Sequence, residues 1–463
     1  MYDIAIIGSG PGGYTAGIRA ALKGAKVAVI EEDKLGGVCL NRGCIPSKSL
    51  IAGANLYQKM KHANSFGITL DSPPRPDWPA MQARKDKIVS GLVGGIGTLF
   101  KSYGVEHYNG FGRLVSKNKI HVDLSDETET EIEAKNIIIA TGSRPAIIPA
   151  FPIDGTNVLS SDHLLEMESL PESMLIIGAG VIGCEWAFML AQLDVKVEMV
   201  EMMPQALPLE DEMISKTIER ELKKLKVKLY TNVKVEHLEI SDNRLINAVL
   251  TDHKKLESEK VLVSIGRAFN TQDIGLEEAG VKLNDNGSIK VSAMMQTSRK
   301  NIYAIGDVAG KVLLAYTAVA EGAVAVDNCM GGSVRADYNT FPSVIFTQPE
   351  AASVGLTEEQ ASKKCEIAIG SFPMRGLGKA HAEGEVAGEV KVIGDKKTDK
   401  ILGIHIVGPH ATEVIHTAVL AIKKKLTVSD LGSMIFAHPV ISESVMEACH
   451  NLHQMSVHLP GQK

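Results

Sequence analysis

The sequence predicts an α/β protein with two doubly wound, Rossmann-like halves and an α+β domain at the C-terminal end. Two observations carry the first part: a strand–glycine turn–helix–strand unit begins at residue 2, and a second unit of the same design begins near residue 174. The third observation is a change of pattern after about Tyr338, where an antiparallel hairpin flanked by amphipathic helices is expected. The length agrees, because 463 residues are too many for one hydrophobic core.

Bulk composition excludes several classes of function. A formal net charge of −6 disfavours nucleic acid or an anionic membrane as the main partner. No uninterrupted apolar run is long enough to span a bilayer, and the start "MYDIAIIGSG" enters a strand without the basic segment of a signal peptide. We therefore expect a cytoplasmic protein. Six cysteines in 463 residues are too few for a disulfide framework.

The first unit carries the fingerprint Gly8-x-Gly10-x-x-Gly13 in "GSGPGG". The first glycine permits a tight turn, the second lets backbone N–H groups approach a pyrophosphate, and the third permits close helix–strand packing. The next apolar run ends at Glu31, which follows Gly13 by 18 residues (31 − 13). A carboxylate at that distance is placed to accept a hydrogen bond from a ribose hydroxyl.

The second unit repeats this pattern as Gly178-x-Gly180-x-x-Gly183, and Glu201 follows at the same distance (201 − 183 = 18). One such glycine motif is weak evidence, but two copies in the same context predict two dinucleotide sites. The Glu201 carboxylate would repel a 2′-phosphate, and Met202–Met203 supply no arginine to hold one. The second site therefore favours NAD over NADP.

The intervening segments predict further elements. A rigid loop, "SPPRPDWP", precedes a helical region that ends at about Tyr103, and Gly110–Ile139 reads as a small sheet. Chain crossings between domains are expected near Ala150 and at Arg267–Asn270. In the C-terminal part, "GEVKVIGDKKTDKILGIHIVG" predicts the hairpin, with helices at Thr357–Lys364 and Ala411–Lys425.

The stretch "GGVCLNRGCIPSKSL" holds Cys39 and Cys44. On a regular helix their Cα atoms would lie about 8–9 Å apart, beyond the roughly 7 Å limit for a disulfide. Either the cysteines do not bond, or the helix is distorted between them, and Gly43 and Pro46 supply the means of distortion. A helix that restarts near Cys44 would place its sulfur at a positive dipole end, with Lys48 one turn further on, and would favour the thiolate.

Two other interpretations of the cysteine pair stay open at this point. The two thiols can be buried and inert, although a close cysteine pair in a reducing compartment is more often catalytic, redox-active or metal-binding than structural. A zinc site would need two more ligands at close spacing, whereas the remaining cysteines stand singly, so no metal is expected. These remaining cysteines are Cys184, Cys329, Cys365 and Cys449.

Taken together, the motifs resemble the flavin-dependent pyridine nucleotide–disulfide oxidoreductases of class I, and most closely their dihydrolipoamide dehydrogenase branch. The resemblance covers nearly the whole chain and is highly specific. It depends on "GSGPGG", "GGVCLNRGCIPSK", "ATGSRP", "GAGVIGCEW", "SIGRAFN", "YAIGDVAG", "PEAASVGLTE" and "HPVISE".

The resemblance implies four segments: the first segment of an FAD-binding domain (1–148), an NAD-binding domain (149–270), a second FAD or central segment (271–338) and an interface domain for dimerisation (339–463). It assigns the first glycine turn with Glu31 to FAD and the second with Glu201 to NAD. Further cofactor contacts are implied at Lys48, Gly112, Thr141, Gly142, Ser143, Glu185, Val233, Gly266, Arg267, Asp307 and Ala315.

The resemblance also implies catalytic roles. Cys39 is similar to the thiol that exchanges with substrate, and Cys44 to the thiol that faces the flavin, so that the two form a redox-active disulfide. Lys48 matches the lysine near the flavin ring, with Glu185 as its carboxylate partner. His438 with Glu443 resembles an acid–base pair that reaches the cysteines of the other subunit, which makes the active unit a homodimer.

The implied reaction is oxidation of protein-bound dihydrolipoyl groups by NAD⁺ through FAD and the Cys39–Cys44 disulfide. The implied partner is a lipoylated acyltransferase or carrier protein of a 2-oxoacid dehydrogenase or glycine cleavage complex. Alternatives are an NAD(P)H-dependent reductase of another small disulfide and a flavoprotein that serves mainly as a scaffold. The sequence departs from the usual motifs at Tyr316, Phe269, Phe436 and Val440, and none of these changes removes a catalytic residue type.

Overall fold

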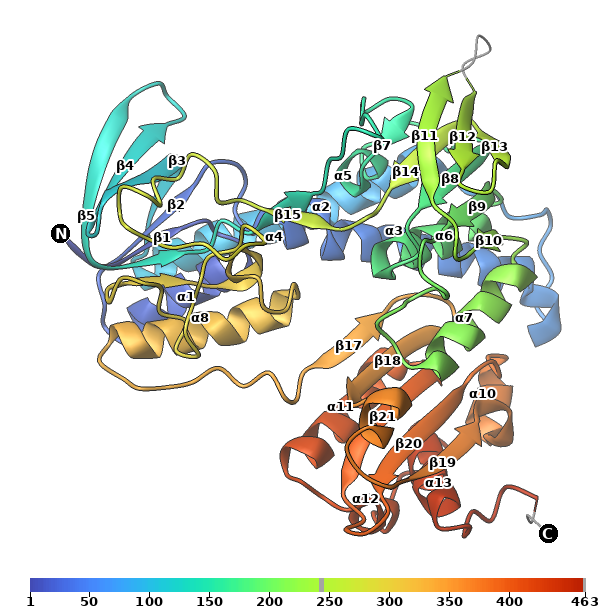
Figure 1. Ribbon diagram of the computed structural model, residues 1–463. Helices are drawn as coiled ribbons and strands as arrows, with labels where there is room; N and C mark the ends of the chain where they lie inside the picture. Colours follow the sequence, from blue (N-terminus) through green and yellow to red (C-terminus); the bar gives the residue numbers. More distant parts are fainter. Residues whose placement is uncertain (241–244, 461–463) are drawn as a thin grey trace.

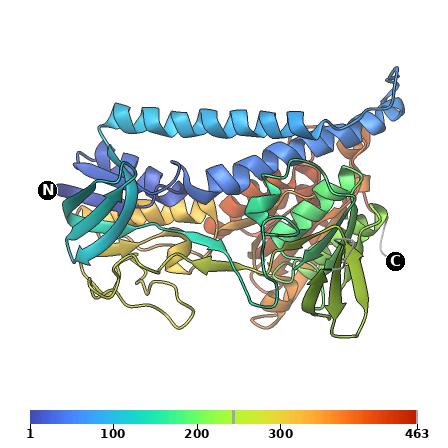
Figure 2. The same ribbon diagram turned by 90° about the horizontal axis from the view of Figure 1, so that it is seen from above.

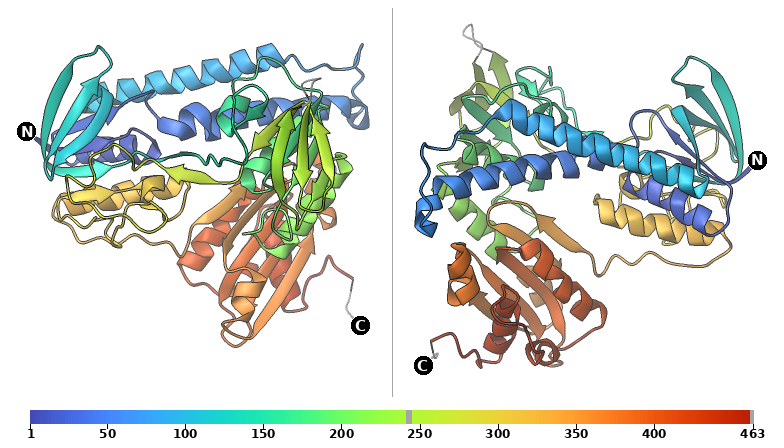
Figure 3. Two further views of the ribbon diagram at one scale, coloured as in Figure 1. Left: turned by 45° about the horizontal axis from the view of Figure 1, so that its top comes forward. Right: turned by 180° about the vertical axis from the view of Figure 1, so that it is seen from behind.

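The computed structural model describes residues 1–240 and 245–460, which form three regions (Figure 1). A first α/β region lies at the left of that view, a second lies at the upper right, and the C-terminal region lies below the second. Both views of Figure 3 place the C-terminal region beside the second region and away from the free end of the first. Among the described residues, no helix combines the length and the apolar character that crossing a membrane requires.

The first region is built on a parallel sheet in the order β3-β2-β1-β5-β16, and β3, β4 and β5 continue as an antiparallel meander. Helices α1 and α8 pack side by side under the sheet (Figure 1). The elements are β1 (Tyr2–Ile7), α1 (Pro11–Leu22), β2 (Val27–Glu31), α2 (Gly37–Arg42), α3 (Cys44–Lys61), η1 (Ala63–Phe66), α4 (Trp78–Tyr103), β3 (Glu106–Ser116), β4 (Lys119–Leu124), β5 (Glu129–Ile139), β16 (Ile302–Ala304), η2 (Gly306–Ala309) and α8 (Ala315–Cys329).

The central strands are apolar along their length because both of their faces are covered. Ile4 and Ile6 of β1 and Ile138 of β5 are fully buried, and Ile6 pairs with Ile138 across the parallel ladder. Parallel strands buried on both faces show continuous apolar runs rather than alternation. The run at residues 2–7 was predicted as a strand for this reason, and the structure confirms it.

The second region repeats the design with a parallel sheet in the order β10-β9-β8-β14-β7. The strands β6 and β15 pair with each other where the chain passes between the two regions. The meander β11-β12-β13 was not predicted from the sequence. The elements are β6 (Ser143–Pro145), β7 (Val158–Leu159), α5 (Ser161–Leu164), β8 (Ser173–Ile177), α6 (Val181–Gln192), β9 (Lys196–Val200), α7 (Glu212–Lys224), β10 (Lys228–Tyr230), β11 (Val235–Ile240), β12 (Ile246–Leu250), β13 (Lys255–Ser258), β14 (Lys260–Val263) and β15 (Arg267–Phe269).

The C-terminal region is an antiparallel sheet in the order β17-β18-β21-β20-β19, packed against helices. The predicted hairpin is β20–β21, and helices lie within both of the ranges that were predicted to flank it. The elements are β17 (Pro342–Ile345), β18 (Glu350–Gly355), α9 (Glu358–Ser362), β19 (Ile367–Pro373), η3 (Met374–Gly376), α10 (Gly378–Glu383), β20 (Glu389–Asp395), β21 (Ile401–Gly408), α11 (Ala411–Lys423), α12 (Val428–Gly432) and α13 (Glu443–Leu452).

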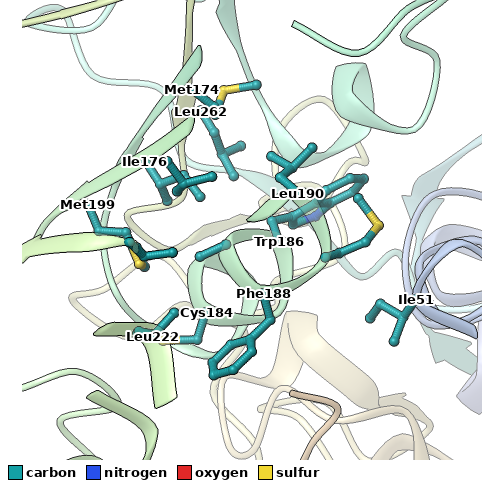
Figure 4. Close-up of a cluster of buried hydrophobic side chains, with 14 of the residues drawn as sticks. Ile51, Met174, Ile176, Cys184, Trp186, Phe188, Leu190, Met199, Leu222 and Leu262 are labelled. Atoms are coloured by element: carbon teal, nitrogen blue, oxygen red, sulfur yellow. The ribbon is translucent and has the colours of Figure 1, made fainter. Parts of the chain in front are cut away.

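Helix α3 joins the regions. It runs beside α4 along the molecule (Figure 2) and packs its middle against α6 of the second region. Figure 4 shows Ile51 of α3 facing the core that contains Trp186 and Phe188 of α6, and Ile345 of β17 belongs to the same buried cluster. Full burial of a side chain such as Phe188 stabilises the fold by about 1.5–3 kcal/mol. This shared core fixes the N-terminal end of α3 where the three regions meet.

Candidate active site

A cavity of about 1520 Å³ runs between the two α/β regions and is lined by both glycine turns and both residues of the cysteine pair. Every site residue predicted from the sequence lines this cavity except Gly183, His438 and Glu443. The structure therefore brings together residues that lie far apart in the chain, from Gly8 to Ala315.

The first glycine turn leads directly into α1. Gly8 has a φ of +99°, and a Cβ added there would lie 2.3 Å from the carbonyl oxygen of Ala140. A Cβ on Gly13 would lie 2.0 Å from the carbonyl oxygen of Gly8, whereas one on Gly10 would meet no atom within 4 Å. The outer two glycines are thus required by close packing, and Gly10 leaves the backbone open to the cavity that it lines.

The second turn has the same geometry. Gly178 has a φ of +101°, and an added Cβ would lie 2.5 Å from the carbonyl oxygen of Ser264. Gly183 is covered by its own turn, because a Cβ there would lie 2.0 Å from the carbonyl oxygen of Gly178. Gly183 does not line the cavity, whereas Gly13, which packs in the same way in the first turn, does. Gly180, like Gly10, has open space before it.

In each unit, the glutamate at the end of the next strand accepts hydrogen bonds from backbone N–H groups of the glycine turn and of the residues that follow the glutamate. Glu31 accepts hydrogen bonds from the Ser9 N–H at 2.8 Å and from the Asp33 N–H at 3.0 Å. Glu201 accepts from the Ala179 N–H at 2.7 Å and from the Met203 N–H at 2.8 Å. Both carboxylates are buried. These bonds hold each acid rigidly at the cavity edge, where a ribose would lie beside a pyrophosphate at the helix N-terminus.

The helix that carries the cysteine pair is broken between them, as predicted. Cys39 lies in α2, which ends at Arg42, and Cys44 is the first residue of α3. Between them Gly43 has φ −148° and ψ −113°, and a Cβ there would lie 3.1 Å from the carbonyl oxygen of Val38. Both cysteines are free thiols. The structure thus presents the reduced pair, and the disulfide stays a prediction for the oxidised protein.

The surroundings favour a thiolate at Cys44. A hydrogen bond from the Cys39 thiol lowers the pKa of Cys44 to about 7; burial opposes this shift, and the charge of Lys48 supports it. The same hydrogen bond and burial raise the pKa of Cys39. The position of Cys44 at the start of α3 acts in the same direction. In the reduced pair Cys44 therefore ionises before Cys39.

A partly buried ion pair, between a half-buried Lys48 and a buried Glu185, lies beside the cysteines. The Lys48 Nζ donates to Glu185 at 2.7 and 2.9 Å, and it lies 4.5 Å from the centroid of the Phe346 ring. The Phe346 N–H donates to Glu185 at 3.0 Å. Lys48 and Glu185 were predicted as partners, whereas Phe346, which follows β17, was missed. No local pattern in the sequence indicates that a residue so far along the chain reaches this site.

Asp307 lies in a hydrogen-bonded cluster at the chain crossing. It accepts a hydrogen bond from the Ser143 hydroxyl, and the Arg267 Nε lies 3.7 Å from its carboxylate. The Arg267 Nη2 also donates to the Ser143 carbonyl at 2.7 Å. Nearby, Thr141 donates to the Asn270 carbonyl at 2.7 Å. The predicted residues of the crossing are therefore in direct contact and present one carboxylate to the cavity.

His438 and Glu443 form a pair away from the cavity. The His438 Nδ1 lies 2.9 Å from Glu443, which also accepts from the Val440 N–H at 2.9 Å. Burial acts to raise the pKa of Glu443, but the hydrogen bonds from Val440 and His438 together lower it. The side chain of His438 is 78% exposed. Within one chain the oriented imidazole thus faces outward and does not line the cavity that contains the cysteines.

Comparison with known proteins gives consistent matches. The family model for pyridine nucleotide-disulphide oxidoreductases matches residues 2–322, and the model for the dimerisation domain of the same family matches residues 341–449. The dihydrolipoyl dehydrogenase of Bacillus subtilis is 42% identical over 461 residues, covering 96% of this chain and 97% of its own. That of Chlamydia pneumoniae is 40% identical, covering 98% of both chains.

Solved structures agree with these matches. LpdA from Mycobacterium tuberculosis superposes with a TM-score of 0.91 at 28% identity, over 97% of this chain and 99% of that protein. The HOCl-induced flavoprotein disulfide reductase RclA from Escherichia coli gives a TM-score of 0.87 at 28% identity, over 96% and 98%. The similarity therefore extends along the full length of the chain.

Proposed function

The chain belongs to the pyridine nucleotide-disulphide oxidoreductase family, and from this premise we propose that it is a dihydrolipoyl dehydrogenase that oxidises protein-bound dihydrolipoyl groups with NAD⁺. Membership confirms the predicted fold class, the oxidoreductase activity and the FAD and NAD cofactors. The observation that carries the proposal is the Cys39–Cys44 pair at a helix break, beside Lys48, in the cavity between two dinucleotide turns.

The residues lining the two halves of the cavity suit the two cofactors. Gly10, Glu31 and Asp307 would hold FAD, and Gly180 with Glu201 would hold NAD. The open space before Gly10 and Gly180 supports this assignment, because a pyrophosphate needs close access to the backbone. Bound FAD supplies electron transfer between the cysteine pair and the nicotinamide.

The cysteines carry out thiol–disulfide exchange. In the oxidised enzyme a dihydrolipoyl thiolate attacks the Cys39 sulfur, the Cys39–Cys44 bond breaks, and Cys44 leaves as a thiolate. The low pKa of Cys44 makes it a good leaving group. The second dihydrolipoyl thiolate then attacks the mixed disulfide at the lipoyl sulfur, which releases lipoyl and Cys39. One of the two substrate protons ends on Cys39, and the other is taken by a base.

That base is His438 of a second copy in our proposal. The dimerisation domain supports a homodimer, and the pair that His438 forms with Glu443 holds the imidazole outward. Glu443 orients the ring and stabilises the imidazolium that forms when His438 accepts the proton. A second copy would bring this base to the cysteines, which the geometry of one chain does not do.

Replacement of the flavin-facing thiol tests the proposed reaction. Purified, FAD-loaded protein is expected to reduce NAD⁺ with dihydrolipoamide, and Cys44→Ser is expected to lose at least about 1000-fold in rate because the disulfide cannot form. Cys365→Ser is the matched control, since Cys365 does not line the cavity. Steady-state NADH formation is the measurement. Normal turnover by Cys44→Ser would contradict the proposal.

One observation keeps a second candidate function in view. RclA, which is named a flavoprotein disulfide reductase, shares this fold over nearly the whole chain. An NAD(P)H-dependent reductase of another small disulfide would prefer NADPH in many cases, whereas Glu201 disfavours a 2′-phosphate. A clear preference for NADPH and no turnover of dihydrolipoamide would favour this second function.

We also infer that a lipoylated acyltransferase or carrier protein in the cytoplasm is the physiological partner. The shared name of the full-length relatives supports this inference. Capture of lipoylated proteins from the native cell by the tagged enzyme, with and without enzymatic removal of the lipoyl group, identifies the complex that is served.

A further inference from the structure

Glu321 is a buried carboxylate that the proposed reaction does not use. It lies in α8 and is 1% exposed. Its hydrogen-bond donors are a backbone amide and a tyrosine hydroxyl. A carboxylate buried in this way lowers stability unless its bonds are well made, so its two partners indicate what it does.

The first partner is the turn that presents Asp307 to the cavity. The Gly306 N–H donates to the Glu321 Oε2 at 2.6 Å, and Gly306 has a φ of +70°. Asp307 is the next residue and lines the cavity. This bond fixes the direction of a peptide that a glycine would otherwise leave free to rotate. The position of the Asp307 carboxylate therefore depends on Glu321.

The second partner lies in the segment that leads to the C-terminal region. The Tyr338 hydroxyl donates to the Glu321 Oε1 at 2.6 Å. Tyr338 stands between α8 and β17, just before the dimerisation domain that begins at residue 341. Glu321 thus bonds the FAD-side turn with one oxygen and this segment with the other.

Burial makes the ionised form of Glu321 depend on its two hydrogen-bond donors. Burial raises the pKa of Glu321 to about 7, and Asp307 adds to the rise; the hydrogen bonds from Tyr338 and Gly306 and the charge of Lys311 oppose it. Burial, together with the Glu321 carboxylate, raises the pKa of the Tyr338 hydroxyl. Removal of either donor would leave less of the desolvation penalty of the buried carboxylate compensated by hydrogen bonds.

We propose that Glu321 is a positioning residue of the FAD site, which holds the Gly306–Asp307 turn in its FAD-binding conformation, and that Tyr338 ties this turn to the segment leading into the dimerisation domain. The inference depends on the proposed FAD site. FAD release from the holoenzyme is slow only while the Glu321–Tyr338 hydrogen bond and the Glu321–Gly306 hydrogen bond are both made.

Three variants separate this role from general stability. Glu321→Leu removes both bonds, Tyr338→Phe removes one, and Glu321→Gln keeps both, because its carbonyl accepts from Gly306 and its amide donates to the tyrosine oxygen. Tyr2→Phe is the matched control, since Tyr2 also donates a hydrogen bond to a glutamate in the first region but does not line the cavity. The measurement is the rate of FAD release from purified dimers, followed by the rise in free-flavin fluorescence.

The expected result is release at least about tenfold faster from Glu321→Leu and about threefold or more from Tyr338→Phe, with Glu321→Gln and Tyr2→Phe close to wild type. Wild-type release from Tyr338→Phe overturns the inference even if Glu321→Leu does not fold. Equal acceleration in Tyr338→Phe and Tyr2→Phe also overturns it, because that result indicates general destabilisation. A wild-type protein that binds no FAD at all would instead contradict the proposed function.

Discussion

At the scale of single residues, the charge on Cys44 is the property that the site controls most closely. A thiolate at the start of α3 is supported by the Cys39 hydrogen bond and by Lys48, and burial opposes it. Because the pKa of Cys44 is lowered to about 7, the thiolate is present above that pH and is lost as the pH falls through it. Its contribution to stability follows the same direction, since in the unfolded chain the thiol would ionise only at higher pH.

Lys48→Gln tests this electrostatic account. Glutamine keeps a donor for Glu185 but removes the positive charge, so the pKa of Cys44 is expected to rise by about one unit. An ultraviolet titration of thiolate absorbance in the reduced, FAD-free protein measures the midpoint, and the titration step is expected to be absent in Cys44→Ser. Lys423→Met, at the exposed C-terminal end of α11, is the control. An unchanged midpoint in Lys48→Gln would show that Lys48 has no part in activating the thiol.

The residues of the site could be predicted from the sequence where they belong to a short local motif. The glycine turns, the acids at fixed distance and the cysteine pair each carry a short motif, and the structure places them together. Phe346 and the Glu321–Tyr338 pair carry no such motif. Their contacts depend on which distant segments the tertiary fold brings into contact, and sequence spacing does not encode that information for a single chain.

At the scale of elements, the duplicated βαβ unit explains how one chain distinguishes two dinucleotides. Glu31 and Glu201 are held by equivalent backbone bonds, so the difference between the two sites lies in the residues around them. Met202 and Met203 line the cavity directly after Glu201 and are exposed. They offer no charge to a 2′-phosphate.

A change at this strand end is expected to shift the nucleotide preference. The double variant Glu201→Ser, Met202→Arg removes the repelling carboxylate and adds a cation, so the ratio of kcat/KM for NADP⁺ to that for NAD⁺ is expected to rise at least about tenfold. Steady-state kinetics with both nucleotides measure the ratio. Leu22→Arg, at the exposed end of α1, adds the same charge elsewhere. If the ratio stays at the wild-type value, Glu201 does not distinguish the 2′-hydroxyl of NAD⁺ from the 2′-phosphate of NADP⁺.

The elements themselves were predicted unequally well. The βαβ units and the C-terminal hairpin have strong periodicity, and the helix break followed from Gly43 and Pro46. The meander β11-β12-β13 was missed. In "VEHLEI" the adjacent polar residues Glu236 and His237 interrupt the alternation, at the point where the register of β11 against β12 shifts, and "KLES" is only four residues long. Neither segment therefore gives a long periodic run. The strand order of each sheet likewise depends on long-range pairing.

At the scale of the whole molecule, the three regions meet around one ion pair. Lys48 comes from the first region, Glu185 from the second, and Phe346 from the start of the third. The shared core behind them fixes their relative positions. The acid–base pair His438–Glu443 does not lie at this meeting point, because it is outside the cavity of its own chain. We therefore infer that two copies of the chain complete each active site.

Mixing two inactive variants tests this claim most directly. His438→Ala and Cys44→Ser homodimers are each expected to be inactive with dihydrolipoamide. A mixed dimer contains one site with an intact cysteine pair facing an intact His438 and one site lacking both. Random reassociation or coexpression is expected to restore about a quarter of the wild-type rate, because about half of the dimers are mixed and each has one complete site. A mixture with no more activity than its two parents, although mixed dimers are present, would contradict the account.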